Sequence, residues 1–286
     1  MKLTKTPDAY MANYAEFGKE FISSSMLALL TRCGHAFYLK CILGWDEHIN
    51  IRQTCGTAAH KARAVNLSQK IKSHEDLPLD EVKDAARDEA KERFETHEYA
   101  PTKEFEGKSK DAAKIITINM GVQMAAKDYD VFQQSIEPAG VEEDVAVEYP
   151  GLNRIIVGRL DVREKGNVIN DFKTSKRAYG QSKAHDSPQL STYGMLHLGK
   201  FGLIPSFYRV QNIVHTGKGD CRHNEYYTER TKEDLQRQFM RYVAACKAID
   251  AGNFIPCDPS EWICSVEWCA FYQRCEFGGL KLTGVK

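Results

Sequence analysis

The feature of this sequence that most constrains its fold is a pair of β-rich segments joined by a tight turn. Residues 154–163 read RIIVGRLDVR, residues 168–174 read VINDFKT, and Gly166-Asn167 lies between them. Gly166-Asn167 is a turn signal, so the two segments are predicted to pair as antiparallel strands. The pairing brings Asp161, near the end of the first strand, beside Asp171 in the second.

Asp171 and Lys173 are separated by one residue, so on a strand both side chains point to one face and Phe172 points into a core on the other. Two carboxylates and an ammonium group suit phosphodiester hydrolysis, because carboxylate oxygens bind hard cations such as Mg²⁺ or Mn²⁺. A lysine there can orient water or stabilise developing negative charge. Taken alone, an Asp-x-Lys pair is more often an exposed salt bridge, but the apolar flanks favour a buried site. Asp161, Asp171 and Lys173 are therefore the predicted catalytic residues.

The remaining periodicity predicts an α/β (α+β) protein with a mixed central β-sheet flanked by helices. Residues 23–38, 56–65, 80–96 and 111–129 carry helical patterns, as do residues 186–200 and the segment that begins at Thr231. Residues 145–149, 203–215 and 223–228 are predicted strands. We expect a single domain over residues 1–286. Its parts are a mainly helical region (1–140), a catalytic sheet core (141–250) and a Cys-rich tail (251–286) that packs back on the N-terminal helix.

Charge and composition limit the possible settings of the protein. Lys+Arg and Asp+Glu both number 39, so the net charge is zero, whereas nucleic-acid binders often carry excess positive charge. The positive charge of a local basic groove and the negative charge of acidic metal ligands can cancel in the net charge, so a net charge of zero does not exclude a nuclease. No apolar run approaches the ~18 residues needed to span a bilayer, and the first 17 residues are too polar for a signal peptide, which predicts a cytoplasmic protein. Nine cysteines without an export signal argue against a disulfide scaffold.

Four segments together resemble the RecB-like exonuclease branch of the PD-(D/E)XK nucleases. GRLDV followed by VINDFKTSK resembles its Gly-x-x-Asp strand and Asp-x-Lys-Thr motif, with Leu160 where the superfamily name has proline. CGTAAH, ending in His60, resembles the Gly-Thr-x-x-His motif, and SPQLSTY, with Gln189 and Tyr193, resembles the Gln-x-x-x-Tyr motif. SSSMLALLTRCGHAFYLKCILG is similar to the opening helix. The resemblance covers roughly residues 22 to 275.

The resemblance implies a restriction-endonuclease-like core with a helical N-terminal part, and a metal-dependent DNA exonuclease activity. His60, Asp161, Asp171 and the backbone carbonyl of Phe172 would bind Mg²⁺ or Mn²⁺, and Gln189 and Tyr193 would support the site. An upstream acidic residue often joins such sites: Glu148 could fill that place, and Glu142, Glu143 and Asp144 are rivals. The exposed cations after the catalytic strand either contact phosphates or lie in a solvated loop: Lys176, Arg177 and Lys183.

By resemblance, the setting is DNA recombination, DNA repair or phage DNA processing in a bacterial or phage-infected cell. The expected substrates are double-stranded ends or single strands. Because the sequence has no Walker A motif, a helicase, recombinase or annealing protein would be a separate partner. The rival functions are a catalytically silent DNA-end-binding protein, a structure-specific endonuclease or RNase with the same site, and a zinc-stabilised interaction module.

The cysteines crowd the C-terminal tail. Cys264, Cys269 and Cys275 lie there, and Cys33 lies in the first predicted helix. One early and three late cysteines resemble the layout of the 4Fe–4S site in the CRISPR-adaptation and AddB types of these nucleases, although the family spacing is Cys-x-x-Cys where this chain has four intervening residues. Cys257 is a spare candidate. The thiols fit a 4Fe–4S cluster, a structural zinc ion or simple buried packing.

Overall fold

The computed structural model describes residues 20–47, 51–97, 107–216 and 219–278. Within these residues, six strands form one mixed sheet in the order β1-β3-β4-β5-β6, with β2 paired to β3. The strands β1 and β3 are parallel, as are β4 and β5, and the other pairs are antiparallel. The predicted class, a mixed central sheet flanked by helices, is confirmed. The strand bounds are β1 Phe21–Ser23, β2 Pro138–Val147, β3 Ile155–Glu164, β4 Val168–Ser175, β5 Phe207–His215 and β6 Cys221–Thr228.

The β3–β4 hairpin forms at the predicted turn. Gly166 and Asn167 have positive φ angles of 77° and 62° in the three-residue loop, residues 165–167, that joins Glu164 to Val168. The ladder runs from Glu164 opposite Val168 to Val162 opposite Asn170. Its continuation places Asp161 across from Asp171, at the point where the two strands separate.

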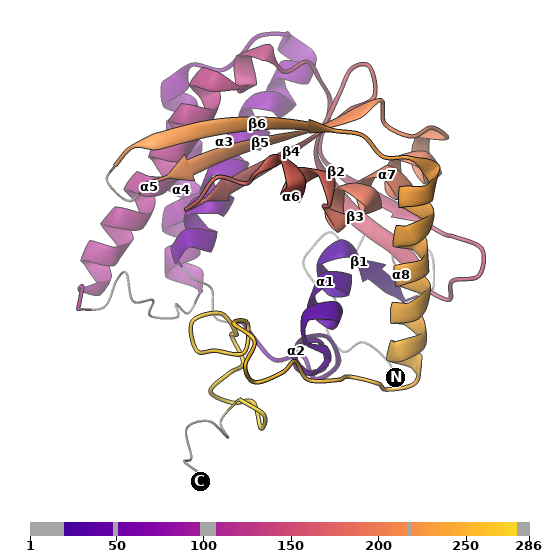
Figure 1. Ribbon diagram of the computed structural model, residues 1–286. Helices are drawn as coiled ribbons and strands as arrows, with labels where there is room; N and C mark the ends of the chain where they lie inside the picture. The colour runs from indigo at the N-terminus through magenta and orange to yellow at the C-terminus, as the bar shows by residue number, and fades with distance from the viewer. Residues whose placement is uncertain (1–19, 48–50, 98–106, 217–218, 279–286) are drawn as a thin grey trace.

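Helices cover both faces of the sheet (Figure 1). Helices α3 (Ile51–Ser73), α4 (Leu79–Thr96) and α5 (Lys110–Val131) pack on one another, and their core includes Phe172 and Ile213 from the sheet. The other core gathers apolar side chains of α1 (Ser24–Arg32), α6 (Gln181–His185), α7 (Pro188–Phe201) and α8 (Lys232–Asp250). The short elements are α2 (Gly34–Phe37), the π-helix η2 (Tyr38–Ile42) and the 3₁₀ helix η4 (Gln133–Ser135).

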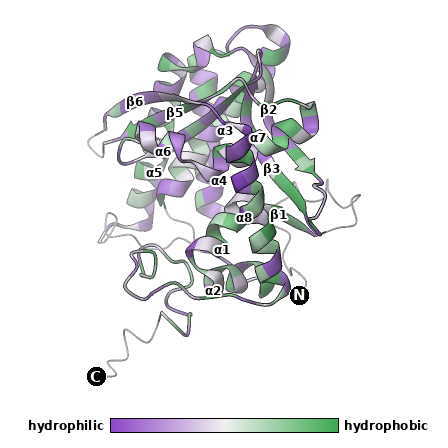
Figure 2. Cartoon of the chain, turned by 45° about the vertical axis from the view of Figure 1, so that its right-hand side comes forward, coloured by the Kyte–Doolittle hydropathy of each residue, from purple (hydrophilic) through white to green (hydrophobic). Residues whose placement is uncertain are grey.

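The distribution of hydropathy follows this arrangement. Figure 2 shows β1 and much of β3 as apolar, whereas β6 is largely hydrophilic. Most β6 residues are exposed or half-buried, since β6 forms an edge of the sheet. Polar side chains on an edge strand oppose pairing with another chain. None of the described helices is long and apolar enough to cross a bilayer.

The single helix predicted for residues 23–38 is wrong, because the structure breaks it at Cys33. Ser23 caps α1 at its N-terminus, but the backbone of Cys33 is extended, with φ −157° and ψ 104°. The tail causes the break: the Gly34 N–H donates to the Ile255 carbonyl at 2.7 Å, and a Cβ on Gly34 would lie 2.6 Å from the Ile255 nitrogen. The kink therefore lets the tail pass close to residues 33 and 34.

Several boundaries also differ from the sequence prediction. Strand β1 was not predicted, because three residues are too short for a period-two pattern to show. Strand β2 begins at Pro138 rather than near residue 145, and α3 includes residues 51–55 ahead of the predicted start near Gly56. The prediction that residues 1–17 are too polar for a signal peptide falls outside the described residues.

Candidate active site

Asp161 lies where β3 and β4 separate. Its carboxylate accepts the hydrogen bond of a β4 backbone N–H beyond the last paired residues of the two strands. The backbone N–H of Phe172 donates to Asp161 Oδ2 at 2.9 Å. His60, from α3, lies on the same group, with its Nδ1 3.9 Å from Asp161 Oδ2. The Phe172 backbone also hydrogen-bonds His60. The hairpin and α3 therefore bring His60, Asp161 and the Phe172 backbone together.

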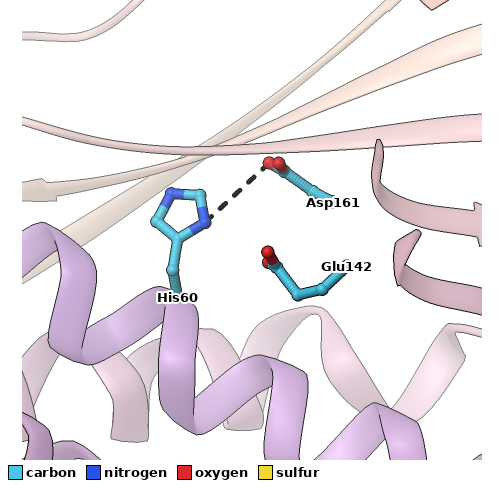
Figure 3. A group of neighbouring side chains, drawn as sticks. All are labelled: His60, Glu142 and Asp161. Carbon is cyan, nitrogen blue, oxygen red and sulfur yellow. Dashed lines mark ion pairs between the residues drawn. The ribbon is translucent and has the colours of Figure 1, made fainter. Parts of the chain in front are cut away.

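Glu142 is the third acidic or imidazole side chain of this group. His60, Glu142 and Asp161 each offer a ligand atom within 4.8 Å of the other two, which is close enough to share one cation. Figure 3 shows the three side chains pointing toward one another, His60 from the helix and the carboxylates from the strands. Glu142 has φ 47°, an uncommon conformation for a residue other than glycine and one often found at functional sites.

The structure selects Glu142 among the upstream acidic residues that the sequence left open. Glu148 is exposed beyond the end of β2, where Val147 pairs with Ile156, five residues from Asp161 and roughly 16 Å away at strand spacing. Glu142 lies directly across from Asp161, between the pairs Val141–Val162 and Glu143–Leu160. The sequence did not reveal this register, because a hairpin centred on the Pro150-Gly151 turn would place residue 142 opposite residue 159, whereas the observed pairing is centred between Gly151 and Leu152.

Helix α3 reaches the strand because Gly56 has no side chain. A Cβ at Gly56 would lie 2.6 Å from Thr174 Oγ1, a separation that real Cβ atoms do not show. Thr174 belongs to β4, next to Lys173, and His60 is one helical turn beyond Gly56. The small residue of the helix motif therefore sets the spacing at which His60 meets the hairpin.

We expect Gly56→Ala to lower the free energy of unfolding by about 1–3 kcal/mol, because the added methyl group overpacks the contact with Thr174. Thr174→Ala in the same chain should recover most of that loss, since the Thr174 Cβ would lie 3.9 Å from the new methyl. Denaturant unfolding of the two single variants and the double variant measures this coupling. Additive losses would show that this contact does not set the spacing.

Asp171, Lys173, Gln189 and Tyr193 form one hydrogen-bonded chain next to the His60 group. Lys173 Nζ donates to Asp171 Oδ1 at 2.8 Å and to Gln189 Oε1 at 3.0 Å. Gln189 Nε2 then donates to the Tyr193 hydroxyl oxygen at 2.7 Å. Helix α7 thus holds the lysine from the side opposite α3. Asp171 is 1% exposed, so its charge depends on this lysine.

Burial and neighbouring charges shift the pKa values of these groups. Burial raises the pKa of Asp161 and of Asp171, against the opposing effect of Lys173. Burial would lower the pKa of Lys173, but the two aspartates outweigh it and raise that pKa. Burial, with help from Lys173, lowers the pKa of His60 to about 4. At neutral pH the lysine is therefore charged, and His60 is neutral and has a lone pair to offer a cation.

A buried arginine that the sequence analysis did not single out lies beneath the site. Arg63 is one turn beyond His60 on α3 and 2% exposed. Its guanidinium pairs with Asp128 on α5 at 2.6 Å, donates to Asn170 at 2.9 Å and also donates to Gln211. It lies 4.7 Å above the ring of Phe172, whose backbone holds Asp161. An arginine in a helix that also carries Arg52 and several lysines gave no sequence signal for this role.

The predicted cysteine residues also come together. Cys33, Cys257, Cys264, Cys269 and Cys275 line one cavity of about 180 Å³ between the first helices and the tail. Arg274 stacks over Trp45 and donates to the Asp46 carbonyl, which ties the tail to the residues after η2. All five thiols are free and half-buried.

Three basic residues, for which the sequence left open phosphate contact or a solvated loop, lie on the surface after β4. Lys176, Arg177 and Lys183 are exposed, and the Lys183 ammonium lies 4.6 Å from the ring centre of Tyr179. No hydrogen bond holds their charged groups in the described part of the chain, so the structure leaves these residues available to solvent or to a ligand.

Comparison with known proteins places this arrangement in a family. A family model of the PD-(D/E)XK nuclease superfamily matches residues 22–276. A crystal structure of a protein named "Putative exonuclease", from Eubacterium rectale, shares the fold with a TM-score of 0.52 and 12% identity, over 99% of this chain and 100% of that one. The crystal structure of the protein SSO0001 has a TM-score of only 0.32 to this chain, with 14% identity over 82% of this chain and 88% of that one. A TM-score this low does not establish a shared fold. No curated protein matches the sequence. Because the family model covers most of its length, the chain belongs to the PD-(D/E)XK nuclease superfamily.

Proposed function

We propose that the protein is a metal-dependent DNA exonuclease of the RecB-like branch. The observation that carries this proposal is the His60, Glu142 and Asp161 group beside the Asp171–Lys173 pair. The three possible cation ligands and the charged Lys173 lie where strands β3 and β4 separate. Asp171 and Lys173 lie on the side of α7, where Gln189 accepts a hydrogen bond from Lys173. The name of the Eubacterium rectale neighbour agrees with this activity.

The donor set fits a hard divalent cation. Three carboxylates, a neutral imidazole and a backbone carbonyl are ligand types that Mg²⁺ or Mn²⁺ accepts. His60, Glu142, Asp161, Asp171 and the Phe172 carbonyl would hold it. A divalent cation supplies Lewis acidity toward a phosphate oxygen. Lys173 positions a water molecule for attack on the phosphorus and stabilises the negative charge that develops on the phosphate, while Gln189 and Tyr193 fix the lysine in that orientation.

The affinity for the cation should depend on pH through Glu142. Burial, with help from Asp161, raises the pKa of Glu142 to about 7. Below that pH the carboxyl carries a proton that a cation must displace, so affinity rises as pH increases through about 7 and then levels off. Because one proton is released when the cation binds, we expect Mn²⁺ affinity to fall about tenfold for each pH unit below this value.

Calorimetric titration with Mn²⁺ at about pH 6, 7 and 8 measures this dependence. Glu142→Gln has no proton to release at this position, so its pH dependence should be shallower by about one proton. Glu148→Gln is the matched control and should retain the slope of the unmodified protein. An unchanged slope in Glu142→Gln would show that Glu142 does not ligate the cation.

End-labelled linear DNA and closed circular DNA of the same sequence test the nuclease proposal. With Mg²⁺ or Mn²⁺, the unmodified protein should degrade linear DNA and leave the circles intact, whereas Asp161→Asn should degrade neither. Cleavage of the circles would make the protein an endonuclease, and cleavage of an RNA of the same sequence alone would make it an RNase. DNA-end binding without any cleavage would identify a catalytically silent end-binding protein.

We propose in addition that the cavity between the first helices and the tail holds a 4Fe–4S cluster. Thiolates are the ligands that such clusters require, and the cavity of about 180 Å³ lies among five of them. A zinc tetrahedron with Zn–S bonds of about 2.3 Å needs sulfurs roughly 3.8 Å apart. Among the described residues, only the His60 group brings three possible ligand atoms within 4.8 Å, so the sulfurs are spaced too widely for zinc. Cys33, Cys264, Cys269 and Cys275 would hold the cluster, which would join the first helices to the tail.

A further inference from the structure

The thiol cavity contains one more cysteine than a 4Fe–4S cluster needs. Four thiolates complete such a cluster, and Cys33, Cys264, Cys269 and Cys275 already number four. The fifth, Cys257, precedes Cys264 by seven residues and lines the same cavity. This fifth thiol either packs in the cavity or can itself bind iron.

Cys257 lies between two of the four expected ligands. Its backbone N–H donates to Cys33 Sγ at 3.4 Å, and Cys33 Sγ also accepts from the Ala36 N–H at 3.4 Å. Burial, together with the nearby sulfurs of Cys33 and Cys264, raises the pKa of Cys257 to about 12. A side chain beside both sulfurs is within reach of an iron atom that either one binds.

Cys275 occupies a different part of the cavity lining. Together with Cys33 and Cys264, it is one of the thiols close enough to Cys269 to raise the pKa of Cys269, after the larger effect of burial. The largest effects of other cysteines on the pKa of Cys257 come from Cys33 and Cys264. Replacement by Cys257 is therefore favoured at the Cys33 and Cys264 positions rather than at Cys275.

We propose that Cys257 is a reserve ligand that replaces Cys264 in the cluster, an inference that rests on the proposed cluster. The exchange balances without an oxidant or reductant. The Cys257 sulfur would form a bond to the iron that Cys264 leaves, and the proton of the Cys257 thiol would pass to the departing Cys264 sulfur. The cluster would thus keep four thiolate ligands after Cys264 dissociates from the iron.

Iron and acid-labile sulfide content of the anaerobically purified full-length chain tests this inference. We expect the unmodified protein and Cys257→Ser to hold similar amounts of both, and Cys264→Ser to keep at least about half of the iron. Cys257→Ser/Cys264→Ser should hold about tenfold less iron than the unmodified protein. The electron paramagnetic resonance spectrum of reduced Cys264→Ser should differ from that of the unmodified protein, since one ligand has changed.

The outcomes separate this inference from the cluster itself. Iron lost as completely from Cys264→Ser as from the double variant would overturn the reserve role and leave the cluster in place. An unmodified protein without iron would overturn both. Cys221→Ser, a half-buried cysteine on β6 away from the cavity, is the matched control and should keep its iron. Circular dichroism of each variant separates cluster loss from unfolding.

Discussion

Lys173→Met should lower kcat by about 10²–10³-fold, the cost of removing one preorganised group that stabilises transition-state charge. Methionine retains the apolar stem of the lysine and removes the ammonium group that contacts Asp171 and Gln189. Because Asp171 is 1% exposed, it then lacks its cationic partner, and we expect its pKa to rise further. Steady-state degradation of linear DNA at saturating Mn²⁺ measures the change.

Lys200→Met is the matched control for this experiment. Lys200 Nζ also contacts a carboxylate, Glu143 Oε1, at 2.9 Å, and its side chain is 36% exposed. We expect that variant to keep its kcat within about twofold, since an exposed ion pair contributes about 1 kcal/mol or less. A Lys173→Met protein that kept more than about a third of the original kcat would contradict the role of the lysine in charge stabilisation.

Arg63→Met should reduce the free energy of unfolding by about 3–5 kcal/mol, because it leaves Asp128 as a buried charge without its cation. It should also weaken Mn²⁺ binding by about 10–100-fold, since Arg63 supports the Phe172 ring and the Phe172 N–H holds Asp161. Denaturant unfolding and calorimetric titration measure the two effects separately.

A double variant distinguishes a positioning role for Arg63 from a purely structural one. Arg63→Met/Asp128→Asn removes both charges and should recover about half of the lost stability, while Mn²⁺ binding should stay weak. Lys70→Met is the control: Lys70 lies on the same helix, pairs with Asp76 at 2.9 Å and is away from the cation group. It should lose stability and keep its Mn²⁺ affinity. Recovery of affinity together with stability in the double variant would reduce Arg63 to a structural role.

The hairpin shows how much of the site geometry follows from sequence alone. Gly166 and Asn167 predict a turn between the two strands, and the structure gives both residues positive φ in a three-residue loop, with Glu164 opposite Val168. The turn sets the register, and the register places Asp161 across from Asp171. The one-residue spacing of Asp171 and Lys173 likewise sets both on one face, with Phe172 buried on the other. These relations act over a few residues, where backbone preference and strand periodicity are sufficient.

The same local rules predicted most helices and the mixed sheet. Ser23 caps α1, Ser187 caps α7 and Thr231 begins α8 with a capping box, as hydroxyl residues ahead of apolar periodic segments predict. The break at Cys33 was not predicted, because its cause is the backbone of residue 255, more than 200 positions later in the chain.

Tertiary structure alone decided which distant residues complete the site. Glu142 rather than Glu148 meets His60, because the β2–β3 register fixes which carboxylate faces α3. Arg63 gains its partners from residues 65, 107 and 148 positions away, on α5, β4 and β5. Cys257 becomes a neighbour of Cys33 across 224 positions. A turn or a cap is chosen by the conformational preferences of adjacent residues, whereas a buried ion pair or a thiol cavity exists only once hydrophobic burial has packed separate elements together.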